Sequence, residues 1–135
     1  MAHSSEPEYR LYVTPRFDEA TQKDGIALRL ETAKVFASFQ YDLSVKETED
    51  PPRLHLKVLG LKTPPLSLPA TGHARFSREY EKLKGEVEVT VEGIEGKTAT
   101  VLLKIVPNRI QVVRHPKGSF LQVITTDHPD TASEG

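Results

Sequence analysis

The sequence contains no cysteine and no long hydrophobic run. Without cysteine the chain cannot form a disulfide scaffold, a thiolate zinc site, an iron–sulfur ligand set or a cysteine nucleophile. Its longest apolar runs, such as residues 101–103, fall far short of the roughly 20 residues of a membrane-spanning helix. Residues 1–8 lack the basic and apolar regions of a secretory signal. We therefore expect a cytoplasmic protein that does not contact a membrane.

Neither sign of charge dominates, because 18 basic and 19 acidic residues nearly cancel. A partner selected by the overall field of the molecule, such as nucleic acid, is not indicated. The glycines are scattered singly, so neither a phosphate-binding loop nor a dinucleotide fingerprint is present, and there is no nucleophile elbow. The pentapeptide at residues 68–72 resembles the sorting signal of surface-anchored proteins, but the hydrophobic segment and basic tail that such a signal needs do not follow it.

The histidines are too far apart in the sequence to form a local metal-binding motif. Only His55 and His73 make a pair whose relative position in space is of interest. The sequence therefore predicts no catalytic residue, no cofactor and no metal site. The histidines stand at positions 3, 55, 73, 115 and 128.

Apolar and polar residues alternate along much of the chain, which is the pattern of half-buried strands. The clearest examples are residues 35–46, 54–58, 87–91 and 99–105. Charge and two prolines at residues 47–52 indicate a loop. Helical segments between successive strands are missing, which disfavours a parallel α/β sheet. The sequence predicts a mainly β protein, either an antiparallel β-sandwich or, as the alternative, a closed β-barrel.

One segment has the spacing of a helix. Phe76, Tyr80 and Leu83 recur at intervals of four and three residues, and Ser77 is a suitable amino-terminal cap. We expect at most one short helix, near residues 74–84.

A single domain is expected over residues 9–125. Residues 1–8 and 126–135 are polar and aperiodic, which predicts a disordered tail at each end. The first strand begins at Tyr9 and is expected to end at Pro15, because proline cannot donate a ladder hydrogen bond.

Residues 85–125 predict a four-stranded antiparallel meander. If Pro107 and Asn108 form a two-residue turn, Ile105 pairs with Ile110 on the buried face. The glutamates of the first strand of this meander predict a solvated face, with Lys97 and Lys104 as cross-strand partners. These glutamates are Glu86, Glu88 and Glu92.

Residues 96–126 contain no acidic side chain but several basic ones. Such a local excess of positive charge favours a surface for an acidic protein, a phosphate or a single strand of nucleic acid. Sheet surfaces that bind nucleic acid also carry stacking aromatics, and Phe120 is the only aromatic residue in this window, so nucleic acid is not favoured. The predicted partner-binding patch consists of Arg109, Arg114, His115 and Lys117.

The aromatic residues support a second interpretation. They could line a barrel that holds an apolar small molecule, with a cavity at Phe39, Tyr41 and Phe76. Phe36 breaks the alternation of its segment and could contribute to an interface.

The leading functional prediction is a binding or interaction module without catalytic activity, whose partner is another protein. The alternative is a β-barrel carrier of an apolar small molecule, or an enzyme that acts on one. We expect either a monomer or a dimer that pairs through edge strands.

Overall fold

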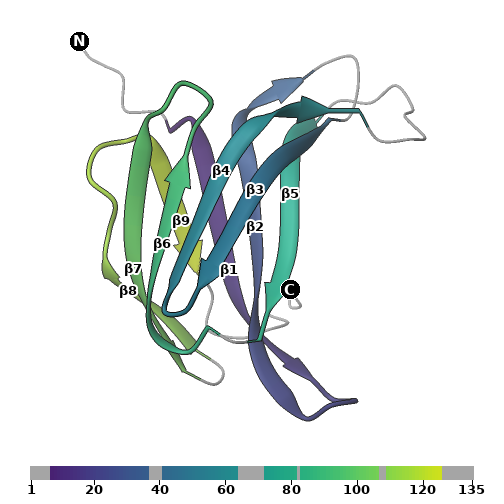
Figure 1. The fold of residues 1–135 in the computed structure, drawn as a ribbon, viewed down its shortest axis with the longest axis vertical. Helices are drawn as coiled ribbons and strands as arrows, with labels where there is room; N and C mark the ends of the chain where they lie inside the picture. The colour runs from purple at the N-terminus through teal and green to yellow at the C-terminus, as the bar shows by residue number, and fades with distance from the viewer. Residues whose placement is uncertain (1–6, 37–40, 64–71, 82, 107–108, 126–135) are drawn as a thin grey trace.

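The computed structural model describes residues 7–36, 41–63, 72–81, 83–106 and 109–125. In these residues it has strands and no helix, which confirms the prediction of a mainly β protein (Figure 1). The strands are β1 (Tyr9–Asp18), β2 (Lys23–Phe36), β3 (Asp42–Asp50), β4 (Arg53–Lys62), β5 (Gly72–Tyr80), β6 (Gly85–Glu92), β7 (Thr98–Val106), β8 (Arg109–Arg114) and β9 (Leu121–Thr125).

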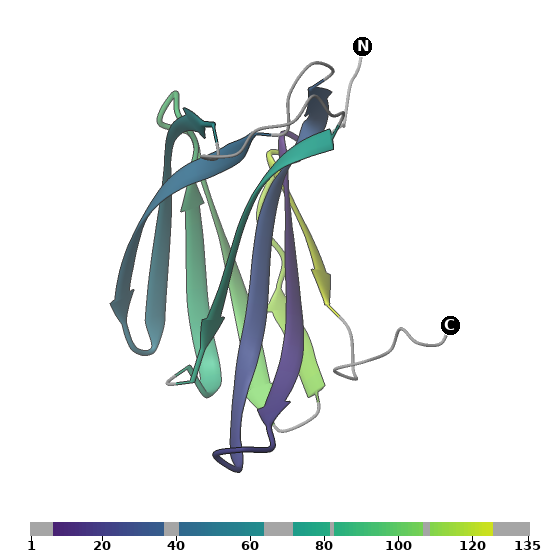
Figure 2. The same ribbon diagram turned by 90° about the vertical axis from the view of Figure 1, so that its right-hand side faces the viewer.

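All these strands belong to one sheet, in the order β8-β7-β6-β4-β3-β5-β2-β1-β9. The sheet is mixed, because β1 with β9, β3 with β5, and β4 with β6 are parallel, whereas the other neighbours are antiparallel. It wraps around so that β8, at one end of the order, approaches β1 and β9 at the other (Figures 1 and 2). The result is a nearly closed barrel, intermediate between the predicted sandwich and the predicted closed barrel.

The interior of the barrel is filled by apolar side chains that alternate along the strands. Leu11, Leu28 and Leu56 are fully buried, and each such side chain contributes about 1.5–3 kcal/mol by leaving water. The other buried apolar residues are Tyr9, Val13, Ile26, Leu30, Leu43, Leu54, Val58, Ala74, Tyr80, Leu83, Val87, Val89, Val91, Ala99, Val101, Leu103, Ile105, Ile110 and Leu121.

Within the sheet the shortest pairing is that of β3 with β5, which pair only at Asp42 and Arg75 and then diverge (Figure 1). Side chains bridge the strands beyond that point. Glu47 of β3 accepts hydrogen bonds from the Arg78 guanidinium and the Tyr80 hydroxyl of β5, both at 2.6 Å. Burial, together with the nearby Glu47 carboxylate, raises the pKa of Tyr80 well above its ordinary value of 10.0.

The prediction of a helix near residues 74–84 is wrong for the part that the structure describes as a strand, because Gly72–Tyr80 forms β5. The spacing of Phe76 and Tyr80 fits the period of a helix and also that of a strand, since residues four apart share one face of either element. Pairing with β2 decides between them, with Phe76 opposite Leu30 and Tyr80 opposite Ile26.

The prediction of a four-stranded antiparallel meander is confirmed for β6, β7 and β8 but is wrong for the last strand. The register of β7 and β8 is confirmed, with Ile105 opposite Ile110, whereas the turn at residues 107–108 lies outside the described residues. Strand β9 instead pairs in parallel with β1. Tyr9 and Phe120 hold this pair together, because the two rings pack edge to face at 5.4 Å and the Tyr9 amide donates to the Phe120 carbonyl.

Three strand boundaries also differ from the prediction. β1 continues through Pro15, which pairs with Ile26 of β2. Among the described residues no strand pairs with the other side of β1 at this point, so proline is tolerated there. Residues 47–50 belong to β3, so that the turn is confined to residues 51–52. Residues 35–46 are not one strand, because β2 ends at Phe36 and β3 begins at Asp42.

Candidate functional site

A groove of about 320 Å³ lies on the outer face of β6 and β7, beside the segment that follows β8. Thr98, Thr100 and Leu102 form its floor, because they alternate with the buried residues of β7 and therefore face outward. Its remaining lining residues are Glu88, Ala99, Arg114, His115 and Lys117.

A β-bulge in β8 places Arg114 over this floor. Leu103 pairs with Val112, but the preceding residue of β7, Leu102, pairs with Arg114 rather than with Val113. In a regular ladder the side chain opposite Leu102 would be a valine. The bulge thus replaces an apolar side chain by a guanidinium at this point, which is a common use of bulges near binding sites.

The positive charges of the groove come from Arg114 and Lys117. Within the described part of the chain, neither Arg114 nor Lys117 forms an ion pair. Glu88 is the carboxylate of the groove, and its Oε1 lies 3.5 Å from Nε of Arg53 on β4. The groove therefore carries two cations that lack an ion-pair partner among the described residues, beside an imidazole and two hydroxyl groups. Such groups bind carboxylates and phosphates.

Three of the four residues of the predicted patch meet in this groove. Arg114, His115 and Lys117 line it together, whereas Arg109 lies at the other end of β8, opposite Val106. Residues from the segment without acidic side chains therefore lie together in the structure, whereas their role as a partner-binding patch stays a prediction. The sequence did not reveal the floor, because Thr98 and Thr100 belong to a different strand.

The structure describes two of the three residues predicted to line a cavity. Phe39 lies outside the described residues. Tyr41 and Phe76 pack against the core, and neither lines a cavity found among the described residues. Tyr41 instead packs edge to face with Phe36, with 5.4 Å between the ring centroids.

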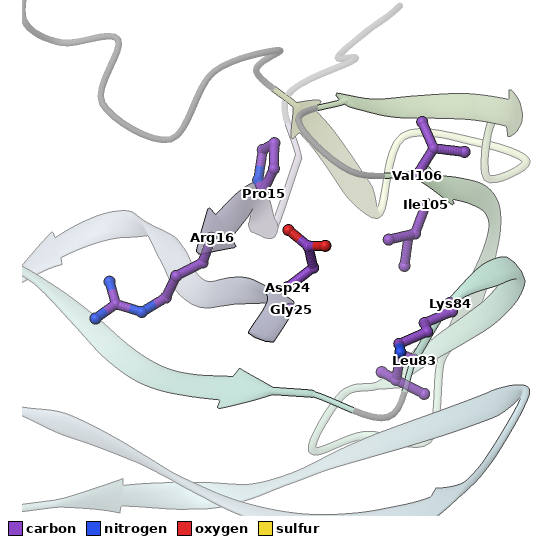
Figure 3. Close-up of a pocket in the computed structure, with 8 residues that line it drawn as sticks. All are labelled: Pro15, Arg16, Asp24, Gly25, Leu83, Lys84, Ile105 and Val106. Atoms are coloured by element: carbon purple, nitrogen blue, oxygen red, sulfur yellow. The ribbon is translucent and has the colours of Figure 1, made fainter. Parts of the chain in front are cut away.

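A smaller cavity of about 130 Å³ lies at the end of the barrel that contains the β1–β2 hairpin (Figure 3). Its lining combines apolar side chains such as Leu83 and Ile105 with the carboxylate of Asp24. Figure 3 shows the Arg16 guanidinium directed away from the cavity, where its Nε pairs with Glu79 at 3.0 Å. Asp24 and Lys84 both line the cavity, but no ion pair joins their side chains in the described residues, so we assign no chemistry to the cavity.

The two histidines of interest have separate environments. His55 Nε2 lies 3.0 Å from Oε1 of Glu92 on the neighbouring strand, and His73 Nδ1 lies 2.7 Å from the Thr32 carbonyl oxygen. In the described ranges no group of three histidine, aspartate or glutamate side chains is arranged to hold a metal ion.

The glutamate face of β6 is paired differently from the prediction. Glu88 and Glu92 contact Arg53 and His55 of β4, not lysines of β7. Lys104 does lie opposite Glu86, as predicted. The prediction for Lys97 is wrong, because its amine pairs with Glu8 at 3.0 Å, and this contact raises the pKa of Lys97.

A second charged cluster, which sequence reasoning missed, lies on the outer face of β1, β2 and β5. The Glu31 side chain is only 5% exposed, although it points away from the core. Guanidinium nitrogens of Arg10, Arg29 and Arg75 lie 3.7, 3.7 and 3.4 Å from its oxygens. The Tyr12 hydroxyl donates to it at 3.3 Å. These side chains cover the carboxylate and neutralise it, which makes burial of the charge tolerable.

The chain matches no protein-family model, no curated protein and no solved structure. None of the described residues belongs to a helix that could cross a membrane.

Proposed function

We propose that the protein is a binding module without catalytic activity, and that its groove on β6 and β7 receives an acidic segment of another protein. The observation that carries the proposal is the meeting of Arg114 and Lys117, without counterions in the described residues, above the hydroxyl groups of Thr98 and Thr100. A partner carboxylate would supply the missing negative charge.

The chemistry of the groove suits a carboxylate. A guanidinium can donate two parallel hydrogen bonds to a carboxylate, and the lysine adds a second charge. The Thr100 hydroxyl already shares a hydrogen bond of 2.9 Å with Thr90, so it is held in place on the sheet. The Glu88 charge is partly offset by Arg53, which limits its repulsion of an acidic ligand.

The experiment is a titration of the full chain with a fluorescein-labelled peptide of alternating glutamate and glycine, followed by fluorescence anisotropy. Charge-assisted hydrogen bonds contribute about 1.5–3 kcal/mol each, so Arg114→Gln should weaken binding by about tenfold or more. Arg109→Gln is the matched control, since it removes the same charge from the same strand at a point outside the groove.

We expect the control to change the affinity by less than about threefold, because a charge outside the contact acts only through a screened field. Equal losses for the two variants would show that binding follows bulk charge, which contradicts the proposal. A single-stranded oligonucleotide that binds more tightly than the peptide would also contradict it and would indicate nucleic-acid binding instead.

A further inference from the structure

A larger cavity, of about 570 Å³, lies at the end of the barrel opposite the β1–β2 hairpin. It is separate from the groove on β6 and β7, because the two share no lining residue. Its size falls within the usual range for small-molecule sites, which are largely apolar with few polar groups. The apolar side chains that line it are mainly Tyr9, Phe36, Leu43, Leu61 and Ile94.

A bulge in β4 directs Leu61 into this cavity. The pairing of β3 and β4 shifts between Ser44 and Val45, so that Leu61 lies opposite the buried Leu43. Leu59, two residues earlier, points outward and is 55% exposed. A regular strand would place Leu59 and Leu61 on the same face, so the bulge separates them.

An irregularity in β2 lies at another wall of the cavity. The pairing of β2 with β5 passes from Glu31 opposite Arg75 to Val35 opposite His73, which leaves extra residues on β2. Those residues, 32–34, and Phe36 line the cavity. Two strand irregularities on different walls therefore meet at one end of the barrel, where bulges commonly shape a site.

The cavity leaves large apolar side chains in contact with water. Leu61 is 42% exposed and Ile94 is 59% exposed. Contact with an apolar ligand would remove this surface from water, at about 25 cal/mol for each Å² buried.

The charges at the cavity favour an anionic group on that ligand. Its carboxylate, Glu8, is already paired with Lys97 at 3.0 Å. Its ammonium group, on Lys34, lies 5.2 Å from the centre of the Phe36 ring and forms no ion pair with the described residues. One cation therefore stands at the edge of an apolar surface without a partner of opposite charge in those residues.

From this juxtaposition we infer that the cavity binds a small amphipathic anion, such as a medium- or long-chain carboxylate. The apolar chain lies against Phe36, Leu43 and Leu61, and the carboxylate pairs with Lys34. The inference does not depend on the function proposed for the groove, since no residue is common to the two sites.

The test is isothermal titration calorimetry of the full chain with dodecanoate and dodecyltrimethylammonium, each below its micellar concentration, and with dodecanol below its solubility limit. Dodecanoate should bind most tightly. Leu61→Glu should weaken its binding by about tenfold or more, because the bound ligand would cover the new carboxylate with its apolar chain and the two negative charges would repel each other. The matched control is Leu59→Glu, which introduces the same charge on the outer face of the same strand and should change the affinity by less than about threefold.

A second variant keeps the test informative if Leu61→Glu does not fold, as judged by circular dichroism. Lys34→Gln should weaken dodecanoate binding severalfold and leave dodecanol binding unchanged, since only the carboxylate uses the ammonium group. Equal binding of dodecanoate and dodecyltrimethylammonium, or equal effects of Leu59→Glu and Leu61→Glu, would overturn the inference. So would the absence of binding by all three ligands.

Discussion

Replacement of Glu31 by glutamine should destabilise the protein more than its position on the outer face of the sheet suggests. The carboxylate lies 3.4–3.7 Å from three guanidinium groups. At an effective dielectric constant of about 20, each pair has a gross Coulomb energy of about 4–5 kcal/mol. Desolvation of the carboxylate costs several kcal/mol, and the guanidinium groups are 29–49% exposed and keep part of their hydration.

We therefore expect Glu31→Gln to lower the free energy of unfolding by about 2–3 kcal/mol, since the three arginines then repel one another without a counterion. Urea denaturation followed by circular dichroism measures this difference. Glu79→Gln is the control. Its ion pair with Arg16 is shorter, at 3.0 Å, but Glu79 is 59% exposed, so its loss should cost less than about 1 kcal/mol.

Addition of Arg75→Gln to the Glu31→Gln protein should restore part of the lost stability, because it removes one of the repelling charges. Equal decreases in the free energy of unfolding for Glu31→Gln and Glu79→Gln would contradict this expectation, since burial would then not change how much an ion pair contributes to stability. A double variant less stable than Glu31→Gln alone would contradict the claim of repulsion.

Two further substitutions test the packing of the barrel. Tyr80→Phe should cost about 1–2 kcal/mol at pH 7 through the lost hydrogen bond to Glu47. The raised pKa of Tyr80 means that the folded state retains the hydroxyl proton above pH 10.0, where the unfolded state loses it, so the stability of the wild type falls there. The difference in free energy of unfolding between the wild type and Tyr80→Phe should therefore shrink. Urea denaturation at several pH values measures this difference, and a constant difference would contradict the expectation. Gly25→Ala should cost about 1–3 kcal/mol, because the new methyl carbon would lie 2.5 Å from the Tyr80 carbonyl oxygen. Thermal unfolding measures that loss, and an unchanged midpoint would show that the two strands can separate without cost.

Local alternation was sufficient to predict the strands whose partners are close in the sequence. Strands β7 and β8 are joined by a short connection, and the pairing of Ile105 with Ile110 follows from the hydrophobic pattern alone. Strand β9 was predicted as an element, but its partner was not. The contact of Phe120 with Tyr9 joins the two ends of the domain, and no local signal reports it.

The spacing of Phe76 and Tyr80 shows the limit of periodicity in a short segment. An interval of four residues fits a helix and also one face of a strand, so the choice rests on pairing with β2, which a single sequence does not reveal.

The candidate sites were likewise predictable only where their residues are close together in the sequence. The cluster of Arg114, His115 and Lys117 was predictable, because its members are close in the sequence and no acidic residue lies near them. The bulges that place Arg114 above the groove and Leu61 in the cavity were not predictable, since each depends on a shift in pairing with a neighbouring strand. The burial of Glu31 could not be predicted either, because it depends on the register of three strands, β1, β2 and β5.

The most direct test of the proposed function is a map of backbone amide chemical shifts, recorded as the acidic peptide is added to the isotope-labelled protein. We expect the perturbed amides to gather around the groove, at Thr98, Thr100, Arg114 and Lys117, with little change at Arg109. Shifts centred on the Arg10, Arg29 and Arg75 cluster, or no shifts at all, would contradict the account.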